Sequence, residues 1–93
     1  MEDIDKLVRE TLPSMPDPFD THELIIKLAH QNQRSYVDAL QQVNGEAPFQ
    51  TLHSMIGKAI LKMADEFNLS HSTWSSQDIF GNDNSCVRWT KIK

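Results

Sequence analysis

Two stretches of apolar residues with helical spacing, one on each side of Asn44-Gly45, constrain the fold of this chain most strongly. The first stripe consists of Ile25, Leu28, Ala29, Tyr36, Ala39, Leu40 and Val43. The second stripe consists of Phe49, Leu52, Ile56, Ile60, Met63 and Phe67. Apolar side chains at this spacing form one face of an amphipathic helix, and Asn-Gly commonly ends a helix. The pattern predicts two long antiparallel helices that bury these faces in one core.

Local signals mark where the first long helix begins. Asp20 and Glu23 have the spacing of a capping box, in which each side chain bonds the other residue's backbone N–H. Phe19 and Leu24 occupy the two positions of a hydrophobic staple around that box. We therefore expect Asp20 to cap this helix and Phe19 to pack on its start.

The second long helix is expected to begin at Pro48, which suits the first helical position because that N–H needs no partner. Gly57 interrupts the helix at a cost of about 1 kcal/mol relative to Ala. Close approach of another backbone is the predicted reason for it. Asn68 suits the C-terminal end.

The N-terminal segment, residues 1–18, is predicted to be a short acidic helix followed by a connector. Asp3 suits the N-cap of the helix. Its apolar face consists of Ile4, Leu7, Val8 and Leu12. Prolines at positions 13, 16 and 18 predict that residues 12–18 run extended, because proline disfavours the helical conformation of the residue before it.

After residue 69 the pattern is typical of β structure. Residues 81–84 are a cluster of turn formers, and residues 85–92 alternate as in a strand. The first arm of the predicted hairpin lies within residues 73–80. Because a lone hairpin is marginal in water, Trp74 and Trp89 are expected to anchor it on the helices. The fold class is thus predicted as α+β, with three helices followed by a C-terminal β-hairpin.

Size and composition limit the classes of function. A chain of 93 residues predicts a single domain, with a helical hairpin over 19–68 and a β-hairpin over 69–93. A domain of this size can form one hydrophobic core but is too small to enclose a deep cavity. With one cysteine it forms no intrachain disulfide, and no apolar run approaches the ~20 residues of a membrane span. We therefore expect a cytoplasmic protein without membrane contact.

The distribution of charge favours a protein partner over nucleic acid. The net charge is −4, and residues 1–23 carry seven acidic but only two basic side chains. Such a chain repels phosphate. Residues 24–93 carry seven basic and six acidic side chains, which weakens this objection for the C-terminal part.

No motif predicts catalysis, a cofactor or a metal. The four histidines, His22, His30, His53 and His71, lack the i, i+4 spacing of a helical metal site. Nothing in the strand context of Cys86 predicts a reactive thiol, and we interpret it as a structural cysteine. No glycine-rich phosphate loop or Ser-His-Asp order is present. We expect a non-enzymatic protein.

Asn32 lies in the middle of the first apolar stripe, where a buried amide needs hydrogen-bonding partners. One interpretation is that it bonds the proline connector or a loop backbone. The other is that it makes a polar contact in a ligand groove or in a seam between two copies, since Asn is a known register device. A homodimer therefore stays open as an alternative.

The order of elements over residues 20–93, two helices joined by a short turn and then a hairpin, resembles a winged helix-turn-helix. The resemblance implies that the second long helix contacts nucleic acid. Candidate contacts are Thr51, Ser54, Lys58 and Lys62 on that helix, with Arg88 and Lys91 on the last strand. The competing interpretation is a solvated helix face. We predict a small binding module with a protein partner, and keep nucleic-acid binding as the alternative.

Overall fold

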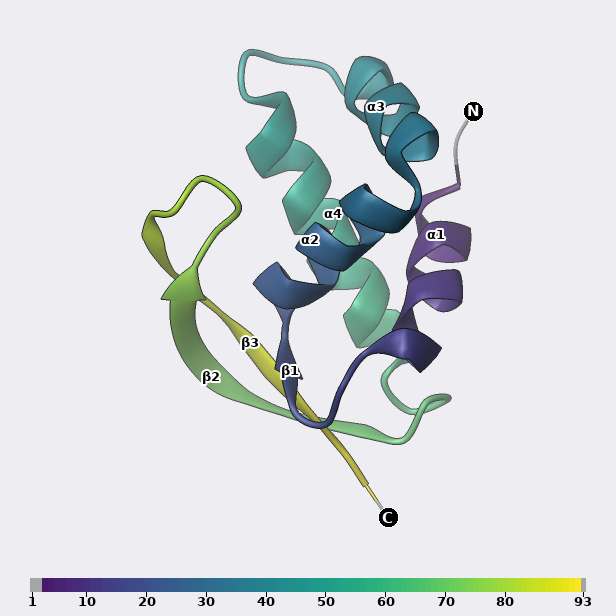
Figure 1. Cartoon of the computed structure of the whole chain (residues 1–93), viewed down its shortest axis with the longest axis vertical. Helices are drawn as coiled ribbons and strands as arrows, with labels where there is room; N and C mark the ends of the chain where they lie inside the picture. Colours follow the sequence, from purple (N-terminus) through teal and green to yellow (C-terminus); the bar gives the residue numbers. More distant parts are fainter. Residues whose placement is uncertain (1–2, 93) are drawn as a thin grey trace.

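The computed structural model describes residues 3–92, and its first element is helix α1 (Ile4–Thr11) (Figure 1). The Asp3 carboxylate accepts a hydrogen bond from the backbone N–H of Lys6 at 3.2 Å, so the predicted N-cap is confirmed. A 3₁₀ helix (Leu12–Ser14) follows directly. The prediction that residues 12–18 are extended throughout was wrong for this first part, because proline is tolerated in the first turn of a helix.

The predicted long helix after Asp20 is two helices, α2 (Thr21–Gln31) and α3 (Gln33–Gln42). The chain bends at Asn32, whose φ of −130° and ψ of 56° are not helical. The backbone N–H of Asn32 still donates to Leu28 O, and that of Tyr36 donates to Asn32 O. Because helical hydrogen bonds continue on both sides of Asn32, the apolar residues keep their helical spacing across the bend. The sequence pattern therefore gives no sign of the bend. The prediction of one continuous helix was wrong here.

The start of α2 is built as predicted. The backbone N–H of Glu23 donates to Asp20 Oδ1 at 2.8 Å, and that of Asp20 donates to Glu23 Oε1 at 3.0 Å. Phe19 and Leu24 are both buried in the same core. The capping box is therefore confirmed, and so is the burial of both staple residues.

Helix α4 (Pro48–Met63) begins at Pro48, as predicted. It contacts α1, α2 and α3, and Figure 1 shows it crossing behind α2. Beyond it the chain turns and reaches Asn68, whose φ of 56° lies in the left-handed region. There the backbone N–H of Leu69 donates to Ala64 O at 2.8 Å, which closes the helix in the way Asn favours. The predicted pair of long helices is thus a group of three.

Strands β2 (Leu69–Gln77) and β3 (Asp83–Lys91) pair antiparallel and form the predicted C-terminal hairpin. Its first arm begins earlier than expected, and the Ser-rich residues 70–76 belong to it. The turn is organised by Asp78, whose Oδ1 accepts hydrogen bonds from the backbone N–H groups of Phe80 and Asn82 at 2.9 and 3.0 Å. The turn therefore lies at residues 78–82 and overlaps only the first part of the predicted turn-forming cluster, residues 81–84.

A third strand, β1 (Phe19–Asp20), precedes α2 and was not predicted. It pairs with β3, with Phe19 opposite Trp89, and the strand order is β1-β3-β2. Only two residues long, it shows no alternation that a sequence pattern could reveal. The α+β class is confirmed, with one more helix and one more strand than expected. The winged-helix likeness stays a prediction.

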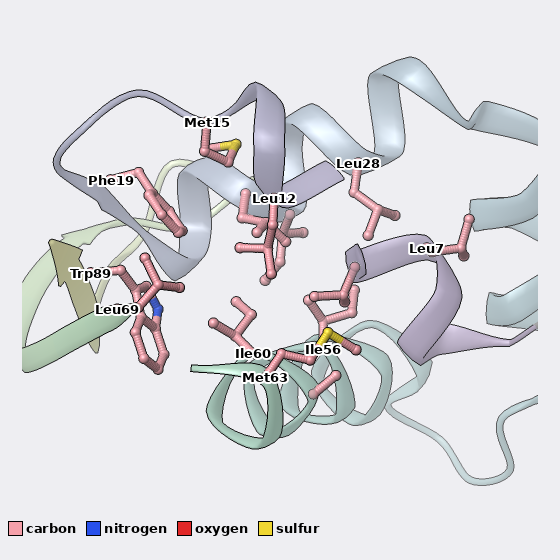
Figure 2. Close-up of a cluster of buried hydrophobic side chains, with 14 of the residues drawn as sticks. Leu7, Leu12, Met15, Phe19, Leu28, Ile56, Ile60, Met63, Leu69 and Trp89 are labelled. Carbon is pink, nitrogen blue, oxygen red and sulfur yellow. The ribbon is translucent and has the colours of Figure 1, made fainter. Parts of the chain in front are cut away.

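The core lies between the helices and the sheet (Figure 2). The predicted core residues Ile25, Leu28, Tyr36, Leu52, Ile56, Ile60 and Met63 are buried, and Leu40 and Phe67 are partly buried against them. Trp89 is fully buried, but Trp74 is 42% exposed. The prediction that Trp74 anchors the hairpin was wrong, since its ring faces the guanidinium of Arg88 at 4.3 Å.

Within residues 3–92, no helix combines the length and the apolar composition that crossing a bilayer requires.

Candidate functional site

A groove of about 470 Å³ runs between the start of α2, one side of α4 and the hairpin. Its volume is within the usual range of ligand-binding clefts. Helix α4 contributes Gln50, His53, Ser54, Gly57, Lys58 and Leu61. The hairpin contributes Asp78, Asn84, Ser85, Cys86 and Val87, and α2 contributes Thr21, His22 and Ile25.

Gly57 lies in the α4 wall of this groove. A Cβ atom built on it would meet one atom within 4 Å, the Thr21 Cγ2 methyl at 3.8 Å. That is an ordinary van der Waals contact with a side chain, so the prediction that another backbone approaches Gly57 was wrong. Packing does not require glycine at this position, although glycine in a helix interior costs about 1 kcal/mol. Because glycine has no side chain, the groove wall stays open at this position.

Three polar side chains on the groove side of α4 have no polar partner in the described range 3–92. Gln50, Ser54 and Lys58 are exposed, and none of them makes a hydrogen bond or ion pair with any residue in the described range 3–92. Apolar surface lies beside them, because Leu61 is 49% exposed and Val87 is half-buried. The groove can therefore offer both hydrogen bonds and apolar contact to a ligand.

The fold brings two histidines to this groove that are far apart in sequence. His22 Nδ1 lies 2.8 Å from the Ser76 hydroxyl, and His53 Nε2 lies 2.6 Å from the Tyr36 hydroxyl. Burial lowers the pKa of His53, the nearby His22 lowers it further, and Asp78 opposes the shift. Burial also raises the pKa of the Tyr36 phenol. Nε2 of a neutral His53 can therefore accept a hydrogen bond from the Tyr36 hydroxyl, which keeps its proton.

The turn of the hairpin is fixed beside the groove. Phe80 packs edge-to-face on Phe49 at the start of α4, with 5.0 Å between ring centroids. The backbone N–H of Asn82 holds the pKa of Asp78 below its ordinary value, and the N–H of Phe80 acts in the same direction. Asp78 is thus an anion that organises the turn, and the turn is tied to α4 by an aromatic contact.

Three donor groups of different chemistry lie close together, and two of them, His22 and Cys86, line the groove. A carboxylate oxygen of Asp20, a ring nitrogen of His22 and the thiol of Cys86 all lie within 4.8 Å of one another. Asp20 is buried, and the other two residues are half-buried. Helical spacing in the sequence does not reveal this group, because its members come from β1, from the first turn of α2 and from β3. Only the pairing of β1 with β3 brings them together.

The predicted nucleic-acid contacts on α4 differ in their surroundings. Thr51, Ser54, Lys58 and Lys62 are all exposed on α4, but Ser54 and Lys58 line the groove whereas Thr51 lies in a separate hollow beside Met55. Lys62 Nζ pairs with Asp5 at 2.7 Å.

The two strand residues of that set are also engaged elsewhere. The guanidinium of Arg88 stacks on Trp74. Lys91 Nζ donates to the carbonyl of Met15 at 3.0 Å. Lys58 is therefore the one cation of the set, within the described range, that has no partner in the fold.

Asn32 lies outside this groove and is half-buried. Its side chain makes no hydrogen bond with residues 3–92, so the interpretation that it bonds the proline connector was wrong. A role for Asn32 between two copies stays a prediction.

Comparison with known proteins identified no relative: no family model, no curated protein and no solved structure matches this chain.

Proposed function

We propose that this chain is a non-enzymatic binding module that holds a short segment of a partner protein in the groove between α4 and the hairpin. The observation that carries the proposal is Gly57, which lines the groove where packing alone would accept alanine. Glycine lowers the stability of a helix, and packing does not require it at position 57. Its presence there is consistent with the groove needing space for a ligand.

The chemistry of the groove suits a polypeptide. Gln50 and Ser54 supply uncommitted donors and acceptors for a backbone, and Leu61 supplies apolar contact. Lys58 and Asp78 bring one charge of each sign, so the groove has no strong field of either sign. A single uncommitted cation suits a peptide better than a phosphate backbone, whose binding depends on several.

A matched pair of substitutions tests this proposal. Peptides would be selected from a random display library on the wild-type protein, and their affinities measured by fluorescence anisotropy. Ser54→Tyr fills the groove, whereas Thr51→Tyr places the same ring on α4 outside it. We expect Ser54→Tyr to weaken peptide binding at least about tenfold, a loss of about 1.4 kcal/mol, and Thr51→Tyr to leave it unchanged. Equal effects of both, or no selectable peptide, would argue against the groove.

Nucleic-acid binding is the second candidate, and the order of elements favours it. Two helices joined by a short turn and then a hairpin resemble a winged helix-turn-helix, with α4 in the position of the helix that enters a groove. The charges of the described residues support this less well, because only Lys58 among the predicted cations lacks a partner in the fold.

We further propose a cytoplasmic location. Cys86 is a free thiol, and a domain of this size without disulfides is easiest to maintain in a reducing compartment.

A further inference from the structure

Asp20, His22 and Cys86 supply an oxygen, a nitrogen and a sulfur donor within 4.8 Å of one another. Zinc binds these three atom types at about 2.0–2.3 Å, which places tetrahedral ligands about 3.3–3.7 Å apart. The three donor atoms therefore need to draw together by up to about 1.5 Å to share one ion.

We propose that Asp20, His22 and Cys86 form a zinc site with one open coordination position. This inference goes beyond the binding module proposed above and does not depend on it. Zinc is the ion that best suits this mixed donor set, because a thiolate disfavours magnesium and calcium, which prefer oxygen ligands. Three protein ligands leave the fourth tetrahedral position for water or a ligand, and both His22 and Cys86 line the groove.

The surroundings of the three donors suit a metal site. The Ser76 hydroxyl lies 2.8 Å from His22 Nδ1 and 3.6 Å from Cys86 Sγ, so it can orient both ligands. Hydrogen bonds of this kind to a ligating histidine set its ring orientation. Asp20 is only 5% exposed and uses Oδ1 to cap α2, and that bond fixes the carboxylate next to His22. Cys86 binds as the thiolate, and its proton is released to solvent when the ion binds.

Cobalt(II) titration of the full chain, purified without a histidine tag and kept reduced, tests the site. We expect one ion per chain with tetrahedral d–d bands and a thiolate-to-cobalt charge-transfer band, and displacement of cobalt by zinc. Cys86→Ser should remove the charge-transfer band. Asp20→Asn should weaken binding while preserving the helix cap, since Asn caps as well as Asp. Ser76→Ala should weaken binding about 10–100-fold.

The controls are His30→Ala and His71→Ala, which remove two exposed histidines outside the set and should leave the titration unchanged. Circular dichroism of each variant establishes that it is folded. The wild-type titration decides the proposal even where a variant fails to fold. No stoichiometric binding by the wild type, a charge-transfer band that survives Cys86→Ser, or binding that is lost in the control variants would each overturn the site.

Discussion

The indole N–H of Trp89 donates a hydrogen bond to the hydroxyl of Thr21 at 3.1 Å, inside the core. That hydroxyl donates in turn to the carbonyl of Val87 at 3.2 Å. Trp89 is fully buried, so water cannot replace its partner. Thr21 therefore joins the start of α2 to the last strand, and its methyl group is also the atom that a Cβ added at Gly57 would contact, at 3.8 Å.

Thr21→Val should destabilise the protein by about 1–3 kcal/mol. The substitution keeps the shape of the side chain but leaves the buried Trp89 N–H without an acceptor. Urea denaturation followed by tryptophan fluorescence measures this change. Thr21→Ser, which keeps the hydroxyl, should lose much less. Equal losses for the two variants would show that the methyl group, and not the hydrogen bond, matters at this position.

Asp20→Ala should lower the free energy of unfolding by about 1 kcal/mol, because the N–H of Glu23 loses its side-chain acceptor. The measurement is a denaturation curve recorded with a chelator present, so that metal binding does not contribute. Asp20→Asn is the matched control and should change stability by only a few tenths of a kcal/mol. An unchanged midpoint for Asp20→Ala would contradict the role of the capping box.

Gly57→Ala should stabilise the fold and weaken ligand binding. The gain is about 1 kcal/mol from helix propensity, and the new methyl group finds ordinary contact with Thr21 and no clash. Thermal unfolding measures the first effect, and affinity for a peptide selected on the wild type measures the second. A loss of stability would show that the groove wall is packed more tightly than the structure indicates.

Stability should decline as the pH falls through the ordinary pKa of histidine, and His53 should account for part of the decline. Burial lowers the pKa of folded His53, so the unfolded chain takes up the proton first. The stability that neutral His53 maintains is therefore complete above the unfolded pKa of about 6.5 and is lost as the pH falls below it. Urea midpoints between about pH 7.5 and 5.5 should fall less steeply for His53→Gln. The same slope in both proteins would contradict this assignment.

Any nucleic-acid affinity should be weak and sensitive to salt. Of the predicted cations, Lys58, Lys62 and Arg88 can still reach a phosphate, and Lys62 must first leave Asp5. Because binding falls with a logarithmic slope of about −0.9 per phosphate, the slope should be no steeper than about −3. Fluorescence anisotropy at two salt concentrations measures it, and Lys58→Glu/Lys62→Glu should abolish binding. Nanomolar binding that survives this double reversal would place the contact on another surface.

The features that were predictable from sequence depend on residues close together in the chain. The Asp20–Glu23 capping box spans one helical turn. Pro48 begins α4, and Asn68 adopts the left-handed conformation just beyond its end, so each signal is local. The two apolar stripes are periodic because a helix is periodic. Such signals need no knowledge of the rest of the fold, which is why the α+β class, the hairpin and most of the core could be inferred before any contact was known.

What the tertiary structure decided depends on residues far apart in the chain. The pairing of β1 with β3 joins Phe19 to Trp89, buries that tryptophan rather than Trp74, and brings Cys86 to Asp20 and His22. A two-residue strand has no period of its own, and whether it forms depends on a partner about 70 residues away that closes the sheet. The groove and its donor groups exist only after that closure, because no single element contains them.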